Sequence, residues 1–161
     1  MKIYVVRHGI AEERSPGVEG DPGRRLTPAG AELMKQEARA LAALDLGLDV
    51  ILTSPLVRAV QTAQILAEAI GARNGFRADQ RLAPGFTARH LGEIVSEHRS
   101  AKAVLIVGHE PSLSEVVGQV TGGSRVTLKK GGIASIDIEG HDLTHAVIAW
   151  LLPPRLVNGE P

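Results

Sequence analysis

The sequence predicts an α/β protein of three layers, in which helices cover both faces of a mainly parallel central sheet that has an antiparallel edge. Short runs rich in Val and Ile at 3–6, 50–53 and 103–107 predict buried strands. A segment with helical spacing of apolar residues follows each run, and this alternation is typical of a parallel sheet. Towards the end of the chain strands follow one another without helices, which predicts the antiparallel edge.

Local signals place the other elements. A long polar stretch from Ile10 to Leu26, of a length that is usually functional or mobile, follows the first strand. Thr27 as N-cap and Pro28 at the first helical position begin a helix that runs to about Asp45. The same signal at Ser54-Pro55 opens a second helix, which Gly71 closes. We further expect a strand over 76–82, helices over 88–98 and 111–120, and strands over 126–128, 133–138 and 146–152.

Length and composition predict one domain over 1–152 and a loose C-terminal tail over 153–161. The 18 basic and 18 acidic residues cancel, so no overall field would recruit nucleic acid or an anionic membrane. The chain has no cysteine, which excludes disulfides, thiolate metal ligands and a cysteine nucleophile. No signal-peptide core and no apolar run of roughly 20 residues is present. We therefore expect a cytoplasmic protein.

Unusual polar residues stand at three junctions between a strand and a helix. The first strand ends on Arg7-His8-Gly9, the second leads into a helix with Arg58 in its first turn, and the third ends on Gly108-His109-Glu110-Pro111. In open α/β sheets ligands bind beyond the carboxyl ends of the strands. Two arginines and two histidines would meet there, beside the positive ends of two helices. Guanidinium forks can hold a tetrahedral phosphoryl group bidentately, so the pattern predicts a phosphoryl site.

Three motifs occur in a known order: Arg-His-Gly at the N-terminus, Ser-Pro-x-x-Arg-Ala-x-Gln-Thr from Ser54, and Gly-His-Glu-Pro from Gly108. In these motifs and their order the chain resembles the histidine phosphatase superfamily. Its small size is similar to that of the SixA-type phosphohistidine phosphatases. The Arg24-x-Leu26-Thr27 turn and the strand at 133–135 resemble that branch too. The resemblance implies a phosphoglycerate mutase-like fold and a metal-independent phosphatase without cofactor. It also implies that His8 is the nucleophile and that Arg7, Arg58 and His109 bind the phosphoryl oxygens.

The chemistry of these residues agrees with the resemblance. An imidazole has a reference pKa of about 6.5, so its unprotonated nitrogen is a competent nucleophile near neutral pH. Neighbouring arginines disfavour protonation, and fixed cations can neutralise the transferring charge as Mg²⁺ does. The alternative is a metal site on His8 and His109 with Glu110 or Glu12, but the arginines favour an anion over a dication. Gly9 would let the backbone turn sharply and approach the ligand.

The general acid is the open question in this sequence, because no carboxylate stands out. Glu12, Glu13, Asp21 and Glu110 are the candidates. Arg24 either adds a cation to the rim of the site or is a solvated loop residue. An imidazole leaving group has a pKa near 6.5 and needs little protonation, whereas an alkoxide leaves badly, so a site without a strong acid suits phosphohistidine better than a sugar phosphate. Gln61 and Thr62, one turn after Arg58, are expected to support it.

Only 51 positions separate Arg58 from His109, which leaves no room for a domain that would cap the pocket over small metabolites. We therefore expect a phosphatase that acts on phosphohistidine of a protein such as a histidine phosphotransfer domain. The alternatives are a broad-specificity or small-metabolite phosphatase, or a non-catalytic module of the same fold that binds phosphoproteins. A binding module would not need the nucleophile. Neither nucleic acid nor a membrane is expected as a partner.

Overall fold

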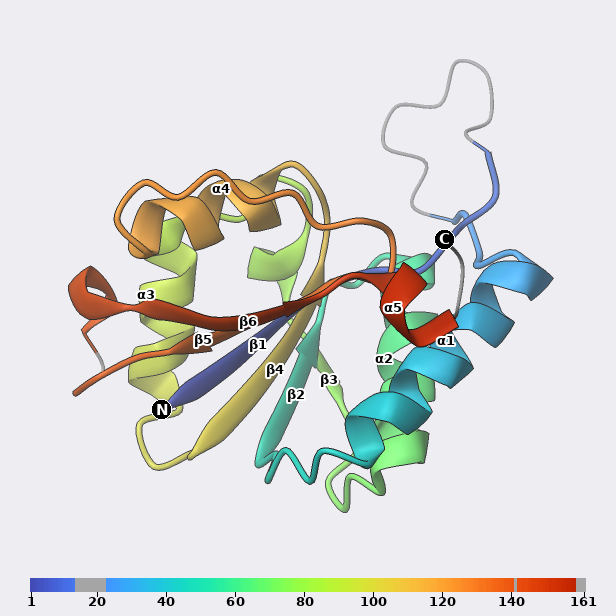
Figure 1. Ribbon diagram of the computed structural model, residues 1–161, viewed down its shortest axis with the longest axis horizontal. Helices are drawn as coiled ribbons and strands as arrows, with labels where there is room; N and C mark the ends of the chain where they lie inside the picture. The colour runs from blue at the N-terminus through green and yellow to red at the C-terminus, as the bar shows by residue number, and fades with distance from the viewer. Residues whose placement is uncertain (14–22, 141, 159–161) are drawn as a thin grey trace.

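The computed structural model describes residues 1–13, 23–140 and 142–158, which form a six-stranded sheet with helices on both faces (Figure 1). The strand order is β3-β2-β4-β1-β5-β6. β3, β2, β4 and β1 are parallel, whereas β5 runs antiparallel to both β1 and β6. The elements are β1 (Lys2–Arg7), α1 (Pro28–Ala42), β2 (Val50–Thr53), α2 (Val57–Ile70), β3 (Arg77–Ala78), η1 (Gln80–Leu82), α3 (Ala88–Glu97), β4 (Ala103–Gly108), α4 (Ser112–Val120), β5 (Ile133–Asp137), η2 (Leu143–His145), β6 (Val147–Leu152) and α5 (Pro154–Asn158).

Alternating side chains of the sheet face two separate cores. Ile3 and Val5 of β1 pack with α3 and α4 on one face, whereas Tyr4 and Val6 pack with α1 and α2 on the other. β4 lies in the middle of the sheet and is buried along its whole length, which explains its continuous apolar sequence. The predicted three-layer fold with a mainly parallel sheet is therefore confirmed.

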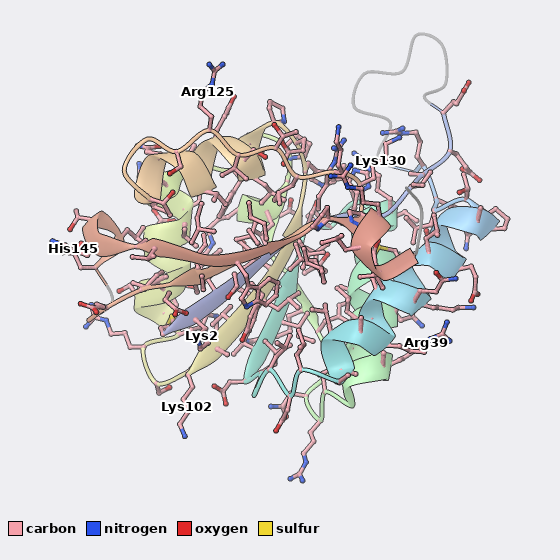
Figure 2. The ribbon with its side chains drawn as sticks, viewed as in Figure 1. Lys2, Arg39, Lys102, Arg125, Lys130 and His145 are labelled. Carbon is pink, nitrogen blue, oxygen red and sulfur yellow. The ribbon has the colours of Figure 1, made fainter. Side chains whose placement is uncertain are left out.

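The register of the parallel strands brings their carboxyl ends to one edge. Arg7 pairs with Gly108, and Thr53 pairs with Val107. The next residue along each strand therefore lies at the same edge of the sheet, and these three residues are His8, Ser54 and His109. The side chain of Lys102 lies at the opposite end of the sheet from that of Lys130 (Figure 2).

The chain after residue 120 differs most from the sequence prediction. Residues 126–128 form no strand; Leu128 N donates instead to Ser114 Oγ at 3.0 Å, so this segment crosses α4. The expected loose end contains the helix α5, which packs against α1 (Figure 1). The predicted strand over 76–82 is only two residues long and is followed by the 3₁₀ helix η1.

The helix starts agree with the sequence in one case and differ in another. Thr27 caps α1 as predicted, since its side chain accepts a hydrogen bond from Gly30 N at 2.9 Å. α1 ends at Ala42 rather than near Asp45. Ser54 does not cap α2, whose N-cap is Leu56 without a side-chain hydrogen bond. The oxygen of Ser54 is directed to the site described below.

The polar stretch after β1 is held at both of its described ends. An isolated bridge joins Ala11 to Leu26, and Glu12 N donates to Arg25 O at 2.9 Å. Asp21, one of the candidate acids, lies outside the described residues. Within the described ranges, no helix combines the length and the apolar character that crossing a membrane requires.

Candidate active site

His8 is buried immediately after β1, and its two ring nitrogens have different partners. Nδ1 lies 2.7 Å from Gly9 O, and a carbonyl oxygen can only accept, so Nδ1 carries the proton. Nε2 is then the unprotonated nitrogen, and it accepts a hydrogen bond from Arg58 Nε at 3.2 Å. The tautomer that these contacts select presents a nucleophilic lone pair towards a guanidinium group.

Arg58 lies in the first turn of α2, where the sequence placed it, and is buried there. Its NH2 group lies 3.4 Å from His109 Nδ1, so this one guanidinium contacts both imidazoles. Thr62, one turn later, donates to Arg58 O at 2.7 Å and accepts from Gly9 N at 3.1 Å. Thr62 therefore ties the start of α2 to the backbone that carries His8.

His109 follows β4 and stacks obliquely on His8, with ring centroids 5.1 Å apart. Its Nε2 lies 2.7 Å from Ser54 Oγ, which also accepts from Leu56 N at 3.3 Å. A serine hydroxyl both donates and accepts, whereas a guanidinium N–H only donates. In the free protein His109 Nδ1 therefore accepts from Arg58, and His109 Nε2–H donates to Ser54 Oγ. This role of Ser54 was missed, because the Ser-Pro pair has the appearance of a helix cap in the sequence.

Two arginines near the imidazoles each have a buried donor that no other described residue accepts from. Arg7 is half-buried and donates through NH1 to Leu128 O at 2.8 Å, while Arg24 donates through NH1 to Glu12 O at 2.8 Å. The Nε atoms of both side chains are buried without a hydrogen-bond partner among the described residues. Buried donors are almost always satisfied in folded proteins. An anion bound between these side chains would satisfy them.

The environment keeps both imidazoles neutral. Burial lowers the pKa of His8 to about 4; the Gly9 hydrogen bond opposes this shift and the charge of Arg58 adds to it. Burial also lowers the pKa of His109 to about 3, with the charges of His8 and Arg58 acting in the same direction. The charge of Arg24 also lowers both pKa values, and Arg24 stays a predicted cation at the rim of the site. At neutral pH the net positive charge of the site therefore comes from arginine.

The candidate acids differ sharply in their surroundings. Glu12 and Glu13 are exposed, and Glu12 Oε2 accepts from Arg25 N at 3.2 Å. Glu110 is half-buried, its Oε1 has no hydrogen-bond partner among the described residues, and burial raises its pKa while a hydrogen bond from Ser114 and the charge of Arg7 lower it. Burial thus gives Glu110 the raised pKa expected of a proton donor.

The structure gives a different reason for a glycine at position 9 than the sharp turn that the sequence predicts. Its backbone is not in the left-handed region; a Cβ atom here would instead lie 2.5 Å from Met34 Cγ, so packing against α1 requires the glycine. Its N–H and C=O are already bonded to Thr62 and His8. Gly9 therefore helps to position the other residues. No group of three or more His, Cys, Asp or Glu side chains that could hold a metal ion occurs within residues 1–13, 23–140 and 142–158.

Comparison with known proteins agrees with this geometry. Residues 3–85 match the histidine phosphatase superfamily, branch 1. This chain belongs to the histidine phosphatase superfamily. An uncharacterized protein of Picosynechococcus is 37% identical over 95% of this histidine phosphatase and 100% of that protein. A Haemophilus influenzae protein described as a phosphohistidine phosphatase SixA homolog is 31% identical over 76% of this chain and 78% of its own length.

A solved structure of the protein histidine phosphatase SixA, complexed with tungstate, has the same fold. It superposes with a TM-score of 0.83 at 21% identity and covers 96% of this histidine phosphatase and 97% of the SixA chain. The fold and the family predicted from the three motifs are thus confirmed, and membership of the superfamily supports phosphatase activity.

Proposed function

We propose that this histidine phosphatase hydrolyses phosphohistidine on a protein substrate, through a phosphohistidine intermediate on His8. The observation that carries the proposal is the contact between the unprotonated Nε2 of His8 and the guanidinium of Arg58. Beside it lies Arg7 Nε, a buried donor that has no partner in the part of the chain that the structure describes. The relatives named as SixA proteins support the choice of substrate.

In the first step the lone pair of His8 Nε2 attacks phosphorus, and the P–N bond of the substrate breaks as the new P–N bond forms. The electron pair of the broken bond stays on the substrate imidazole, which leaves as a neutral ring because its other nitrogen carries a proton. Arg7 and Arg58 hold the equatorial oxygens and neutralise the charge that is transferred. In the free protein Arg58 NH2 donates to His109 Nδ1, and His109 Nε2–H donates to Ser54 Oγ. When a phosphoryl group takes over the Arg58 N–H groups, Ser54 can donate to Nε2 instead, so that the Nδ1–H of His109 donates to a phosphoryl oxygen. Such preorganised donors are the main source of catalysis in phosphoryl transfer.

In the second step water attacks the phosphoryl group on His8, and the bond to Nε2 breaks. The products are inorganic phosphate and the neutral imidazole, whose Nδ1–H remains bonded to Gly9 O throughout. Because the tautomer never changes, His8 needs no proton transfer to be ready for the next turnover. The water proton passes to the phosphate.

The substrate class follows from the leaving group. An imidazole nitrogen with a pKa near 6.5 departs without strong protonation, whereas an alkoxide requires an acid. Glu110 could supply a proton to a less favourable leaving group, but the proposed reaction does not depend on it. The absence of an inserted domain between α2 and β4 supports access by a protein-borne group.

The test is a substrate panel of phosphohistidine, phosphoaspartate and phosphoserine peptides together with sugar phosphates. We expect phosphohistidine to be hydrolysed with the highest kcat/KM, by at least 100-fold over the alkyl esters. Rapid quenching should trap a phosphoenzyme that is labile to acid and that disappears in His8→Ala. Equal rates on phosphohistidine and alkyl phosphates would contradict the substrate class, and a phosphoenzyme that persists in His8→Ala would contradict the nucleophile.

A further inference from the structure

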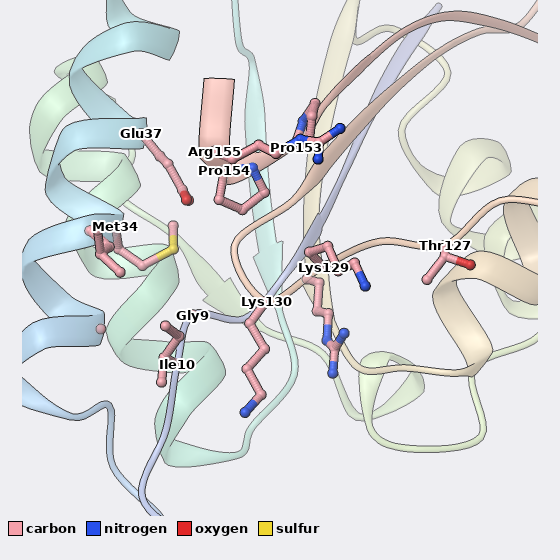
Figure 3. A pocket seen from close by; sticks show the side chains of 13 residues that line it. Gly9, Ile10, Met34, Glu37, Thr127, Lys129, Lys130, Pro153, Pro154 and Arg155 are labelled. Carbon is pink, nitrogen blue, oxygen red and sulfur yellow. The ribbon is translucent and has the colours of Figure 1, made fainter. Parts of the chain in front are cut away.

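A cavity of about 620 Å³ lies beside the phosphoryl site and shares Arg7 and Gly9 with it (Figure 3). One wall is apolar and comes from Ile10 and from the α1 residues Leu33 and Met34. The opposite wall is formed by the segment before β5 and by the start of α5. Of the residues in the proposed phosphoryl transfer, only Arg7 and Gly9 line this cavity, so the mechanism leaves the rest of it without a function.

Three basic side chains stand on the second wall. Lys129 and Lys130 belong to the segment before β5, and Arg155 belongs to α5. All three are exposed, and none forms an ion pair with another described residue. Positive charge from two separate elements therefore gathers at one cavity, although the whole chain has a net charge of zero.

The basic segment is attached directly to the catalytic strand. Gly131 N lies 3.1 Å from both Arg7 O and His8 O, and Arg7 N donates to Gly132 O at 3.0 Å. Lys130 and Lys129 therefore come one and two residues before a glycine whose N–H contacts the backbone that carries the proposed nucleophile. A ligand in the cavity would be held at a fixed position relative to His8.

The carboxyl group of Glu37 is buried in the wall of the cavity, where its side chain points inward from α1 (Figure 3). Its Oε2 has no hydrogen-bond partner among the described residues. Burial raises the pKa of Glu37 to about 8, so the group is protonated at neutral pH. An uncharged carboxyl does not repel an anionic ligand, and it offers a hydrogen-bond donor inside the cavity.

We propose that this cavity is the docking groove for an acidic, amphipathic stretch of polypeptide next to the phosphohistidine of the substrate protein. The proposal rests on the function proposed above. The three cations would pair with Asp or Glu side chains, and the wall of Ile10, Leu33 and Met34 would receive apolar side chains of the same stretch. One basic and one apolar wall match the two faces of such a segment.

The test uses two synthetic phosphohistidine peptides, one with Glu at several flanking positions and one with Gln at the same positions. The wild-type protein should dephosphorylate the Glu peptide with a kcat/KM about tenfold higher, which is the effect of two or three exposed ion pairs. In Lys129→Ala/Lys130→Ala this preference should fall to about two- to threefold, the effect of the one remaining cation, Arg155. In Lys129→Glu/Lys130→Glu it should reverse in favour of a third peptide that carries Lys at those positions.

Arg73→Ala/Lys102→Ala is the matched control, because it removes two exposed cations that do not line the cavity. It should keep the tenfold preference. Equal wild-type rates on the two peptides, or an unchanged preference in Lys129→Ala/Lys130→Ala, would overturn the groove but not the proposed function. An equal loss on free phosphohistidine in that variant would assign the cavity to small anions and would also overturn the groove. Failure of the wild type on all phosphohistidine substrates would instead reject the proposed function.

Discussion

The Nε of Arg58 lies 3.2 Å from Nε2 of His8, so an arginine N–H points at the lone pair that the proposed reaction needs. This contact fixes the direction of the lone pair in the free protein. A phosphoryl group entering the site would take over the guanidinium N–H groups with its oxygens and would meet the lone pair along the same direction. In the free protein the guanidinium of Arg58 therefore holds the lone pair of His8 in place, and the same guanidinium is positioned to bind an anion.

Arg58→Ala should lower kcat/KM for phosphohistidine by at least two orders of magnitude, as for the loss of other fixed transition-state charges. Arg58→Lys should recover little of this loss, because an ammonium group cannot contact both imidazoles and the phosphoryl oxygens with a planar fork. Steady-state kinetics with circular dichroism as a check on folding would measure the effect. Near-normal activity in Arg58→Ala would mean that the site is misassigned.

Thr62→Val should lower kcat by about tenfold while KM changes much less. The substitution keeps the shape of the side chain but leaves Gly9 N without an acceptor in the buried site, and such a loss costs about 1–3 kcal/mol. Thr62→Ser keeps the hydroxyl and should restore most of the rate. If Thr62→Ser were as slow as Thr62→Val, the hydroxyl bridge between Gly9 and Arg58 would not be what positions the site.

The imidazole of His8 should titrate with a midpoint near pH 4 in the free protein. Its folded pKa lies below the reference value, so the nucleophile stays neutral from alkaline pH down to about pH 5, and kcat/KM should not fall between pH 8 and pH 5 through this group. Nuclear magnetic resonance of the ring would follow the titration. Arg58→Ala should move the midpoint upwards, since one cause of the lowering is removed. A midpoint near pH 6.5 in the wild type would contradict the buried, cation-flanked site.

Glu37 should make the protein less stable as the pH rises. Its folded pKa of about 8 exceeds the usual value of 4.5, so the stabilisation is complete below pH 4.5 and is lost between pH 4.5 and pH 8. As the pH rises across this range, the wild type should therefore lose stability relative to Glu37→Gln. The free energies of unfolding of the two proteins should diverge by an amount on the order of 4 kcal/mol. Urea unfolding at pH 5 and pH 9 would measure it. A difference that does not vary with pH would show that the carboxyl is not protonated in the folded protein.

The sequence by itself determined the fold and the four charged or titratable residues that meet at the sheet edge. Buried parallel strands require continuous apolar runs, and Arg7, His8 and His109 follow two such runs directly. Arg58 could be placed because a helix start after β2 must lie at the same edge. These are local patterns, and the parallel arrangement of the strands converts them into a common position in space.

Only the tertiary structure decided the contacts that join distant segments. Ser54 has the sequence of a helix cap, yet its oxygen lies against His109, 55 positions away. Pro154–Asn158 has the composition of a loose end, yet α5 packs on α1 and forms one wall of the cavity that contains Glu37. No local pattern specifies such contacts, because they depend on which faces of separate elements the packing of the sheet brings together.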